Sequence, residues 1–292
     1  MGASRTAEYV ALYRALETTE TRREPLFTDP FARHVLGGSG ALALRLANVT
    51  GLRGLLERYA DWRAPGARTS AIGRTRFIDD VVRAEVARGL QQLVILGAGY
   101  DSRAHRLPAL ATIRVYEVDR AETQSEKRRR IESVTGARTD VRYVAVDFAR
   151  DDLSIRLADR GWRADHASLF VWEGVTNYLD AAAVARVLDM IGRTAAGSAI
   201  VFTYIHRGVL DGSAQFAGAP TLVENVKRLG EPWRFGLVPE ELAAYLAGFG
   251  LALEQDLGAD EYRARYLGAA AHFPGYAFYR VAVARADGRP PA

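Results

Sequence analysis

Glycine and acidic side chains stand at the ends of several strand-like segments of this chain. An apolar run stops at Gly97-Ala98-Gly99, and a second one ends at Asp119, twenty residues after Gly99. Glycine lets the backbone pass close to a ligand and adopt angles that other residues avoid. A carboxylate at this interval is typical of sites in which it accepts hydrogen bonds from ribose hydroxyls. The pair predicts a site for a cofactor that contains a nucleoside.

The residues after this turn bear on which cofactor it is. A dinucleotide site normally has a third small residue, Gly or Ala, at the position that Ser102 occupies here. Asp101 would put a negative charge where a pyrophosphate lies against the helix N-terminus. These residues disfavour NAD, and an adenosine cofactor without phosphate, such as S-adenosylmethionine, fits better.

Two further strand-like segments also end in groups that suit such a cofactor. Asp147 can accept the adenine amino group, and Phe148 offers an apolar surface to the ring, although a helix cap explains Asp147 equally well. Glu173 stands at the end of the next segment and can pair with an ammonium group. Without a partner, its buried charge would be costly.

Three side chains are candidates for general acid–base work. Tyr204 and His206 stand at the end of the fifth strand-like segment, where both are expected to reach the pocket. His206 is the best-placed base, with orienting the substrate or capping a turn as its alternative roles. Tyr178 is a weaker candidate, with lining of the pocket as its alternative role. The histidine and carboxylate spacing gives no metal site.

Strand-like and helical segments alternate along the chain, which predicts an α/β fold with a mainly parallel sheet. Two more strands are expected at 251–257 and 277–286, about seven in all, with a helix that begins at Pro239 and ends at Gly248 or Gly250. The five strand-like segments before them lie at 92–99, 112–119, 141–148, 167–174 and 198–205.

The same pattern divides the chain into four parts. Residues 1–90 read as an N-terminal helical cap and 91–205 as a Rossmann-like cofactor-binding half. Residues 206–238 are expected to be a lid insertion at the carboxyl edge of the sheet. Residues 239–292 would supply a helix and the last strands of the same sheet.

Composition excludes several classes of protein. The chain of 292 residues has no cysteine, so disulfides, thiolate nucleophiles and cysteine-ligated metals are ruled out. Its net charge is only +4, and the basic run at 127–130 is expected to be a solvated helix face rather than a phosphate site. No apolar run is long enough to cross a bilayer, and neither nucleic acid nor membrane is an expected partner. We expect a cytoplasmic protein, because the first residues lack the pattern of a secretory signal. The expected oligomeric state is a monomer or a homodimer.

Taken in order, the segments resemble the leucine carboxyl methyltransferase-like family of class I S-adenosylmethionine-dependent methyltransferases, which includes bacterial polyketide and other natural-product O-methyltransferases. The resemblance extends from about residue 5 to the last strand. The motifs that carry it are RALET, LFTDPFA, RTRFIDD, VILGAGYDSRAHRL, YEVDRAETQSEKRRRI, VAVDF and VWEGVTNYL.

The resemblance implies a seven-stranded class I methyltransferase sheet whose last strand is antiparallel, together with the helical cap. It implies that the Gly97–Gly99 turn lines the methionine part of the cofactor, Asp119 holds the ribose, and Asp147 and Phe148 face the adenine. Glu173 would contact the amino-acid end. A cap arginine, Arg74 or Arg68, would bind the cofactor carboxylate.

The implied activity is methyl transfer to a carboxylate or phenolic hydroxyl of a small, polyketide-like natural product. A protein or peptide C-terminal carboxylate is the alternative acceptor. An NAD(P)-dependent oxidoreductase and a binding protein without turnover are the less favoured functions.

Overall fold

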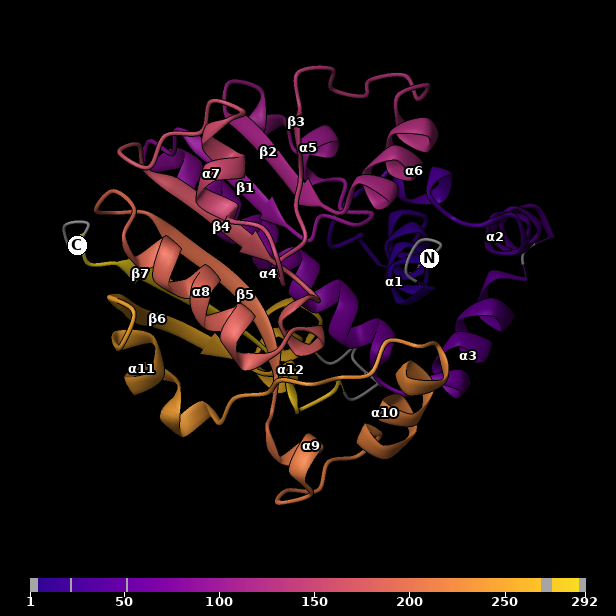
Figure 1. The fold of residues 1–292 in the computed structure, drawn as a ribbon. Coiled ribbons are helices and arrows are strands. Elements are labelled where there is room, and N and C mark those ends of the chain that lie inside the picture. Colours follow the sequence, from indigo (N-terminus) through magenta and orange to yellow (C-terminus); the bar gives the residue numbers. More distant parts are fainter. Residues whose placement is uncertain (1–4, 22, 51, 269–274, 289–292) are drawn as a thin grey trace.

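A seven-stranded sheet forms the centre of the protein (Figure 1), in a computed structural model that describes residues 5–21, 23–50, 52–268 and 275–288. The strand order is β3-β2-β1-β4-β5-β7-β6, with β7 antiparallel to both of its neighbours and the other strands parallel to one another. The strands are β1 (Gln92–Leu96), β2 (Arg114–Asp119), β3 (Arg142–Ala145), β4 (Ser168–Trp172), β5 (Ala199–Ile205), β6 (Leu251–Leu257) and β7 (Tyr279–Ala286). The predicted α/β class, the strand segments and the antiparallel last strand are confirmed.

Alternate residues of each strand enter two separate cores. In β1, Leu93 and Ile95 pack on one face of the sheet, whereas Val94 and Leu96 pack on the other. Successive side chains of a strand point to opposite faces, so a strand covered on both sides is apolar throughout. This explains the continuous apolar run at 93–96.

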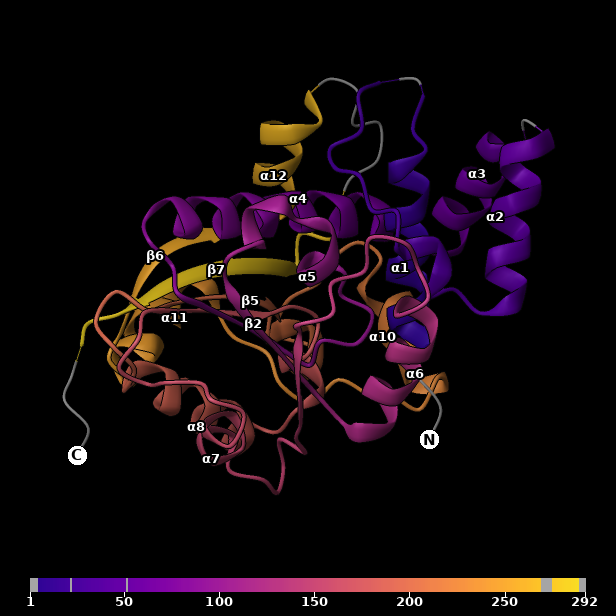
Figure 2. The same ribbon diagram turned by 90° about the horizontal axis from the view of Figure 1, so that it is seen from above.

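Helices cover both faces (Figure 2). One layer contains α4 (Ala67–Ala87), α5 (Arg103–Arg106) and α12 (Ala259–Tyr266), and the opposite layer contains α7 (Leu153–Ala158), α8 (Ala181–Gly192) and α11 (Pro239–Ala247). Helix α11 begins and ends as predicted, with Gly248 at its C-cap. Helix α6 (Ala121–Ile131) connects β2 to β3.

The chain leaves the centre of the sheet at β1, runs outward to β3 and returns to β4. This reversal brings the carboxyl ends of β1 and β4 side by side, the place where open parallel sheets bind ligands. Helix α1 (Arg5–Thr18) lies beyond these ends, since Arg14 Nη2 donates to the Tyr100 carbonyl at 2.5 Å. Helices α2 (Gly38–Thr50) and α3 (Arg53–Arg63) project farther out (Figures 1 and 2).

The insertion between β5 and α11 contains two helices, α9 (Gly208–Asp211) and α10 (Ala219–Arg228). Helix α12 was not predicted, because its sequence is short, polar and weakly amphipathic. It packs on α4, where Gly73 leaves room for the ring of Tyr262. No helix in the described parts of the chain is long and apolar enough to cross a membrane.

The basic run of α6 is only partly solvated, which corrects the expectation for 127–130. Arg128 and Arg129 are exposed as predicted, but Lys127 is buried. Its Nζ donates to Glu117 Oε2 of β2 at 2.6 Å, and both side chains are 1% exposed. A buried lysine needs such a carboxylate.

Candidate functional site

The turn after β1 contains two glycines with different roles. Both have positive φ, +61° at Gly97 and +41° at Gly99, a region that glycine enters without steric cost. A Cβ on Gly97 would lie 2.4 Å from Val175 Cγ2, so this glycine lets the turns after β1 and β4 pack together. At Gly99 the nearest atoms are the Gly97 carbonyl oxygen at 3.8 Å and Ala7 Cβ at 3.9 Å, so there is space on this side.

Asp119, at the tip of β2, is tied directly to this turn. Its Oδ2 accepts a hydrogen bond from the Gly99 amide at 2.6 Å, and its Oδ1 accepts one from the Arg120 amide at 2.7 Å. Burial raises the pKa of Asp119, and the two amides oppose this effect. Each carboxylate oxygen can accept more than one hydrogen bond. The structure therefore brings together two of the predicted elements, the glycine turn and the carboxylate.

Glu173, at the tip of β4, lies between two arginines. Its Oε1 accepts from Arg74 Nε and its Oε2 from Arg103 Nη1, both at 2.8 Å. Burial alone would raise the pKa of Glu173, but Arg103 and Arg74 lower it overall. The carboxylate is therefore ionised, and the partner that its buried charge required is a pair of arginines.

Sequence reasoning missed Arg103, although it follows Asp101 and Ser102 in the quoted motif. Its guanidinium is 1% exposed and also binds Asp79 of α4 and Asp101. Four arginines and four carboxylates form one connected buried network across α1, α4, α5 and the tip of β4. Its members are Arg14, Asp29, Arg106, Asp79, Arg103, Asp101, Glu173 and Arg74.

Asp101 does not present a free charge to a ligand, which corrects the argument built on it. Its Oδ2 accepts from Arg103 Nη1 at 2.5 Å, and its Oδ1 accepts from the Arg103 amide at 2.7 Å. Ser102 is buried as well and donates to Asp29 Oδ2 at 2.6 Å. These two residues hold the turn in place, and Asp101 by itself gives no reason to exclude a pyrophosphate.

The structure separates the two candidate cap arginines. Arg68 Nε and Nη2 donate to the two oxygens of Asp61, at 3.0 and 2.7 Å. Arg74 instead reaches Glu173, and its guanidinium carbon lies 4.8 Å from the centre of the Tyr279 ring. The structure thus brings Arg74 to the tip of β4, and it engages Arg68 with α3.

Asp147 and Phe148 follow β3 at the same edge of the sheet. Asp147 Oδ1 accepts from the Ala149 amide at 3.0 Å, as a turn cap does, and its side chain stays 47% exposed. The ring of Phe148 lies 6.3 Å from that of Trp172. The cap interpretation of Asp147 describes this geometry, and the exposed part of the carboxylate can still accept a hydrogen bond.

Tyr204 is not at this site, contrary to the expectation that it reaches the pocket. Its side chain is fully buried with Phe202 on the α8 and α11 face of the sheet, and its hydroxyl donates to Asp256 Oδ2 at 2.8 Å. Burial raises the pKa of Tyr204, with Asp256 adding to the effect. Strand alternation accounts for the error, since Thr203 and Ile205 face the other side.

His206 caps a turn in this structure. Its Nδ1 accepts from the Gly208 amide at 3.0 Å, so the proton of the neutral ring is on Nε2. The ring lies 4.9 Å from that of Phe216. In this tautomer Nε2 is a hydrogen-bond donor, which suits orientation of a substrate and not proton abstraction.

Tyr178 remains protonated at neutral pH. Burial, followed by the nearby Tyr279, raises its pKa to about 12. The neighbouring Asn177 lies in the same short 3-10 helix, Thr176–Tyr178. It is fully buried, and its Nδ2 donates to no acceptor within the described chain, while its Oδ1 lies 3.5 Å from the Tyr279 hydroxyl.

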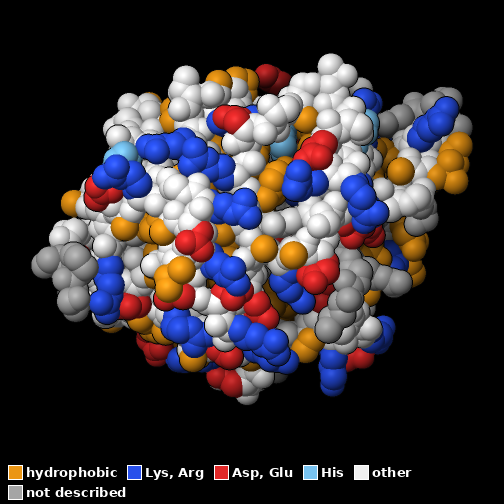
Figure 3. Space-filling view, turned by 45° about the horizontal axis from the view of Figure 1, so that its top comes forward, with side chains coloured by type: hydrophobic (Ala, Val, Ile, Leu, Met, Phe, Trp, Pro, Cys, Tyr) orange, Lys and Arg blue, Asp and Glu red, His pale blue; other side chains and the backbone are white. Residues whose placement is uncertain are grey.

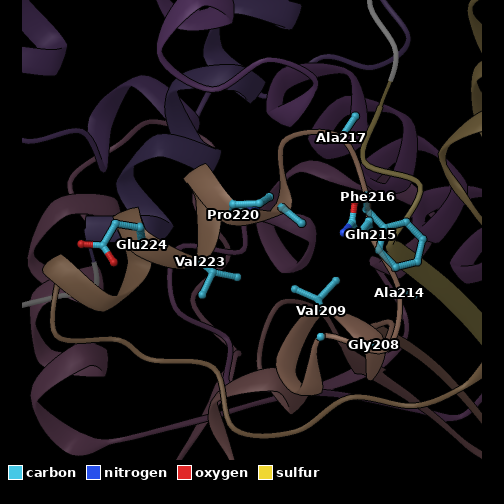
Figure 4. Close-up of a pocket in the computed structure, with 11 residues that line it drawn as sticks. Gly208, Val209, Ala214, Gln215, Phe216, Ala217, Pro220, Val223 and Glu224 are labelled. Carbon is cyan, nitrogen blue, oxygen red and sulfur yellow. The ribbon is translucent and has the colours of Figure 1, made fainter.

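A cavity of about 710 Å³ lies in the insertion (Figure 4). Figure 4 shows Val209 and Val223 on opposite sides of it, with Phe216 at one end. Small and apolar residues form most of its lining, to which Gln215 and Glu224 add polar groups. Its volume is in the range of small-molecule sites.

Aromatic contacts connect this cavity to Arg74. Phe216 lies 5.8 Å from Phe278, Phe278 lies 6.2 Å from Trp233, and Trp233 lies 6.2 Å from Tyr279, measured between ring centres. The Tyr279 ring in turn contacts the Arg74 guanidinium. Within the described residues, no group of three or more histidine, aspartate or glutamate side chains could hold a metal ion.

Comparison with known proteins gives a consistent result. The sequence model of the leucine carboxyl methyltransferase family matches residues 7–192. A protein of Frankia alni named "Putative S-adenosyl-L-methionine-dependent methyltransferase" is 34% identical over 262 residues, which cover 87% of this chain and 84% of that protein. A protein of the same name from Mycolicibacterium vanbaalenii is 38% identical over 178 residues, covering 58% of this chain and 57% of its own.

Two solved structures share the fold over almost the whole chain. A DUF574 family protein from Streptomyces avermitilis aligns with a TM-score of 0.62 and 14% identity, covering 97% of this chain and 98% of its own. A "putative methyltransferase" from Thermobifida fusca aligns with a TM-score of 0.58 and 16% identity, covering 95% and 94%.

Proposed function

The chain belongs to the leucine carboxyl methyltransferase family, and we propose that this S-adenosylmethionine-dependent methyltransferase acts on a carboxylate oxygen of a small, largely apolar acceptor. The observation that carries the choice of acceptor is the state of the three candidate bases. Tyr204 is buried elsewhere, Tyr178 stays protonated, and His206 points a lone pair at a backbone amide. A carboxylate, with a pKa of about 4, needs no base, whereas a phenol at about 10 does.

The residues at the strand tips fit the cofactor. Glu173 would accept its ammonium group, Arg74 would pair with its carboxylate, and Asp119 would accept from a ribose hydroxyl. The open side of Gly99 leaves room for close approach of a ligand to the backbone. The rest of the Gly97–Gly99 turn, including Ala98, would line the methionine part. We place the adenine beside Asp147 and Phe148.

When bound, S-adenosylmethionine supplies a methyl group on a positively charged sulfur that leaves readily. The protein's own task is then to hold the acceptor oxygen in line and to exclude water. The buried Asn177 Nδ2 has no acceptor within the described chain, and leaving such a donor unpaired costs about 1–3 kcal/mol. An acceptor carboxylate would satisfy it, and His206 Nε2 could donate a second hydrogen bond.

The remainder of the acceptor would extend into the insertion. The aromatic contacts from Tyr279 to Phe216 form an apolar path, and the cavity beyond them is lined mainly by aliphatic and small residues. These surfaces favour an apolar or aromatic acceptor. That the acceptor is a polyketide-like natural product remains part of this proposal.

The test is a screen of carboxylic acids and phenols for release of S-adenosylhomocysteine. We expect turnover with apolar carboxylic acids, at a rate that is level from about pH 6 to 9 because the acceptor is already ionised. His206→Ala should raise KM and leave kcat within about tenfold, since the residue orients the acceptor.

Three results would contradict the proposal. One is turnover of phenols alone, at a rate that rises with pH. Another is a loss of kcat of about 10²–10⁴ in His206→Ala, the size expected for a general base. The third is methylation of peptides at their C-terminal carboxylate in place of small acids.

A further inference from the structure

Exposed large apolar side chains are concentrated in the first three helices. Among the described residues, all such side chains except Ile155 lie between positions 9 and 62. Trp62 is 73% exposed and Tyr59 is 59% exposed, values unusually high for aromatic side chains. The others are Tyr9, Leu42, Leu46, Leu52 and Leu55.

Most of these side chains belong to one surface, which we call the hairpin face: Leu42, Leu46, Leu52, Leu55, Tyr59 and Trp62. Leu55, Tyr59 and Trp62 are spaced four and three residues apart, so they share one side of α3. The opposite side of α3, with Glu57, Ala60 and Asp61, is buried. Leu42 and Leu46 are four residues apart on α2, which packs against α3.

The exposed charges within residues 38–66 are all positive. Arg45, Arg58 and Arg63 are exposed, and none of them forms an ion pair within the described structure. The only acids between positions 38 and 66 are Glu57 and Asp61, both buried beside arginines. Figure 3 shows hydrophobic and basic side chains together on this projecting part of the molecule.

We propose that the hairpin face docks on the surface of an anionic lipid bilayer. A helix surface with leucines, tryptophan and tyrosine, flanked by arginines, has the chemistry of an interfacial membrane contact. Aromatic side chains favour the headgroup region, and arginines near an anionic surface are attracted to it. A second copy docked through the same face would bring the unpaired arginines of both chains together, which charge repulsion opposes.

This inference departs from the expectation that no membrane is a partner. That expectation rested on the lack of a long apolar run, which concerns spanning segments only. The hairpin face lies on the surface and would bind without crossing. The inference does not depend on the identity of the methyl acceptor, and its test needs no turnover.

The experiment is cosedimentation of the full chain with phospholipid vesicles. We expect binding to vesicles of phosphatidylcholine mixed with phosphatidylglycerol and much weaker binding to phosphatidylcholine alone. Leu55→Ser combined with Trp62→Ser should reduce the binding about tenfold or more. Ile155→Ser is the control, because it removes an exposed apolar side chain on α7, outside the hairpin face.

The charge component is tested separately. Arg58→Glu combined with Arg63→Glu should reduce binding to the mixed vesicles about tenfold or more, and Arg129→Glu on α6 should not. Unchanged thermal unfolding would show that the variants are folded. Equal binding to both kinds of vesicle would overturn the proposal, as would equal binding by the Leu55/Trp62 variant and the wild type. So would a dimer in solution that this variant dissociates, with no vesicle binding.

Discussion

Burying a charged side chain without a partner costs folding free energy. Lys127 and Glu117 show how this protein meets that cost. Their 2.6 Å contact is shielded from water on both sides, and the second oxygen of Glu117 has no hydrogen-bond partner in the described structure. Burial raises the pKa of Glu117 to about 7, although Lys127 opposes this. Lys127 therefore stabilises the ionised form of Glu117.

Replacing Lys127 with methionine should destabilise the protein by about 3–5 kcal/mol, since it leaves Glu117 buried without its partner. Glu117→Leu combined with Lys127→Met should recover most of that loss, because both charges are then absent. Urea unfolding measures both free energies. Arg129→Ala is the exposed control and should stay within about 0.5 kcal/mol of the wild type. A loss below about 1 kcal/mol in Lys127→Met would refute this account of the pair.

Glu173 should make the stability of the protein sensitive to acid. Because the arginines lower its pKa in the folded state, Glu173 contributes stability above its unfolded value of 4.5 and loses it as the pH falls through the folded-state pKa. The difference in unfolding free energy between wild type and Glu173→Gln should therefore shrink below about pH 4.5. A difference that is the same at about pH 7 and pH 3.5 would show that Glu173 is not held ionised by these arginines.

For single residues, the sequence predicted where the site residues lie better than it predicted which side chains they contact. Strand ends were enough to bring Gly99, Asp119 and Glu173 to one edge. The role of Arg103 could not be predicted, because its partners Asp79 and Glu173 come from elements distant in the sequence. The wrong expectation for Tyr204 could have been avoided. A strict count along the strand shows that Tyr204 shares a face with Phe202 and points away from the face of Thr203.

Two helix glycines of this fold, Gly54 and Gly192, differ in how closely other atoms approach them. Gly54 lies in α3, and a Cβ there would have nothing within 4 Å. Gly192 ends α8, and a Cβ there would lie 1.8 Å from the Phe249 carbonyl oxygen. Only the second glycine is required by packing, because a backbone oxygen cannot move aside as a side chain can.

Gly54→Ala should therefore stabilise the protein by about 0.5–1 kcal/mol, through helix propensity alone. Gly192→Ala should destabilise it by at least about 1–3 kcal/mol, the usual cost of overpacking. Thermal or urea unfolding of the two variants provides the comparison, each serving as the other's control. Equal stability of Gly192→Ala and Gly54→Ala would contradict the close contact between Gly192 of α8 and the Phe249 carbonyl oxygen before β6.

The elements differed in how well they could be predicted. Strands β1, β2, β4 and β5 are buried along almost their whole length and have a dense apolar signal, so they were found close to their observed bounds. Helix α12 escaped because its position depends on contact with α4 and not on its own periodicity. The segment before Ala32 leads into a short 3-10 helix, Ala32–His34. The next α-helix, α2, begins at Gly38. Local signals do not reveal helices held in place by distant contacts.

Over the whole molecule, the sheet order and the buried charge network act together. The sheet places the tips of β1, β2 and β4 side by side, and the network ties the turns after β1 and β4 to α1 and α4 of the N-terminal region. Alternation along the sequence was enough to predict the α/β class. The network and the exposed hairpin face could not be predicted, because both depend on which side each helix turns inward. The division of the chain into four parts, and a cytoplasmic monomer or homodimer, stay predictions.

The central claim is that Asp119 and Glu173 hold S-adenosylmethionine at these tips, and calorimetric titration of the cofactor tests it most directly. Asp119→Ala and Glu173→Gln should each weaken binding about tenfold or more, as loss of a charged hydrogen bond does, while Arg129→Ala binds like the wild type. Wild-type affinity in Asp119→Ala, or saturable binding of NADH in place of S-adenosylmethionine, would contradict the claim.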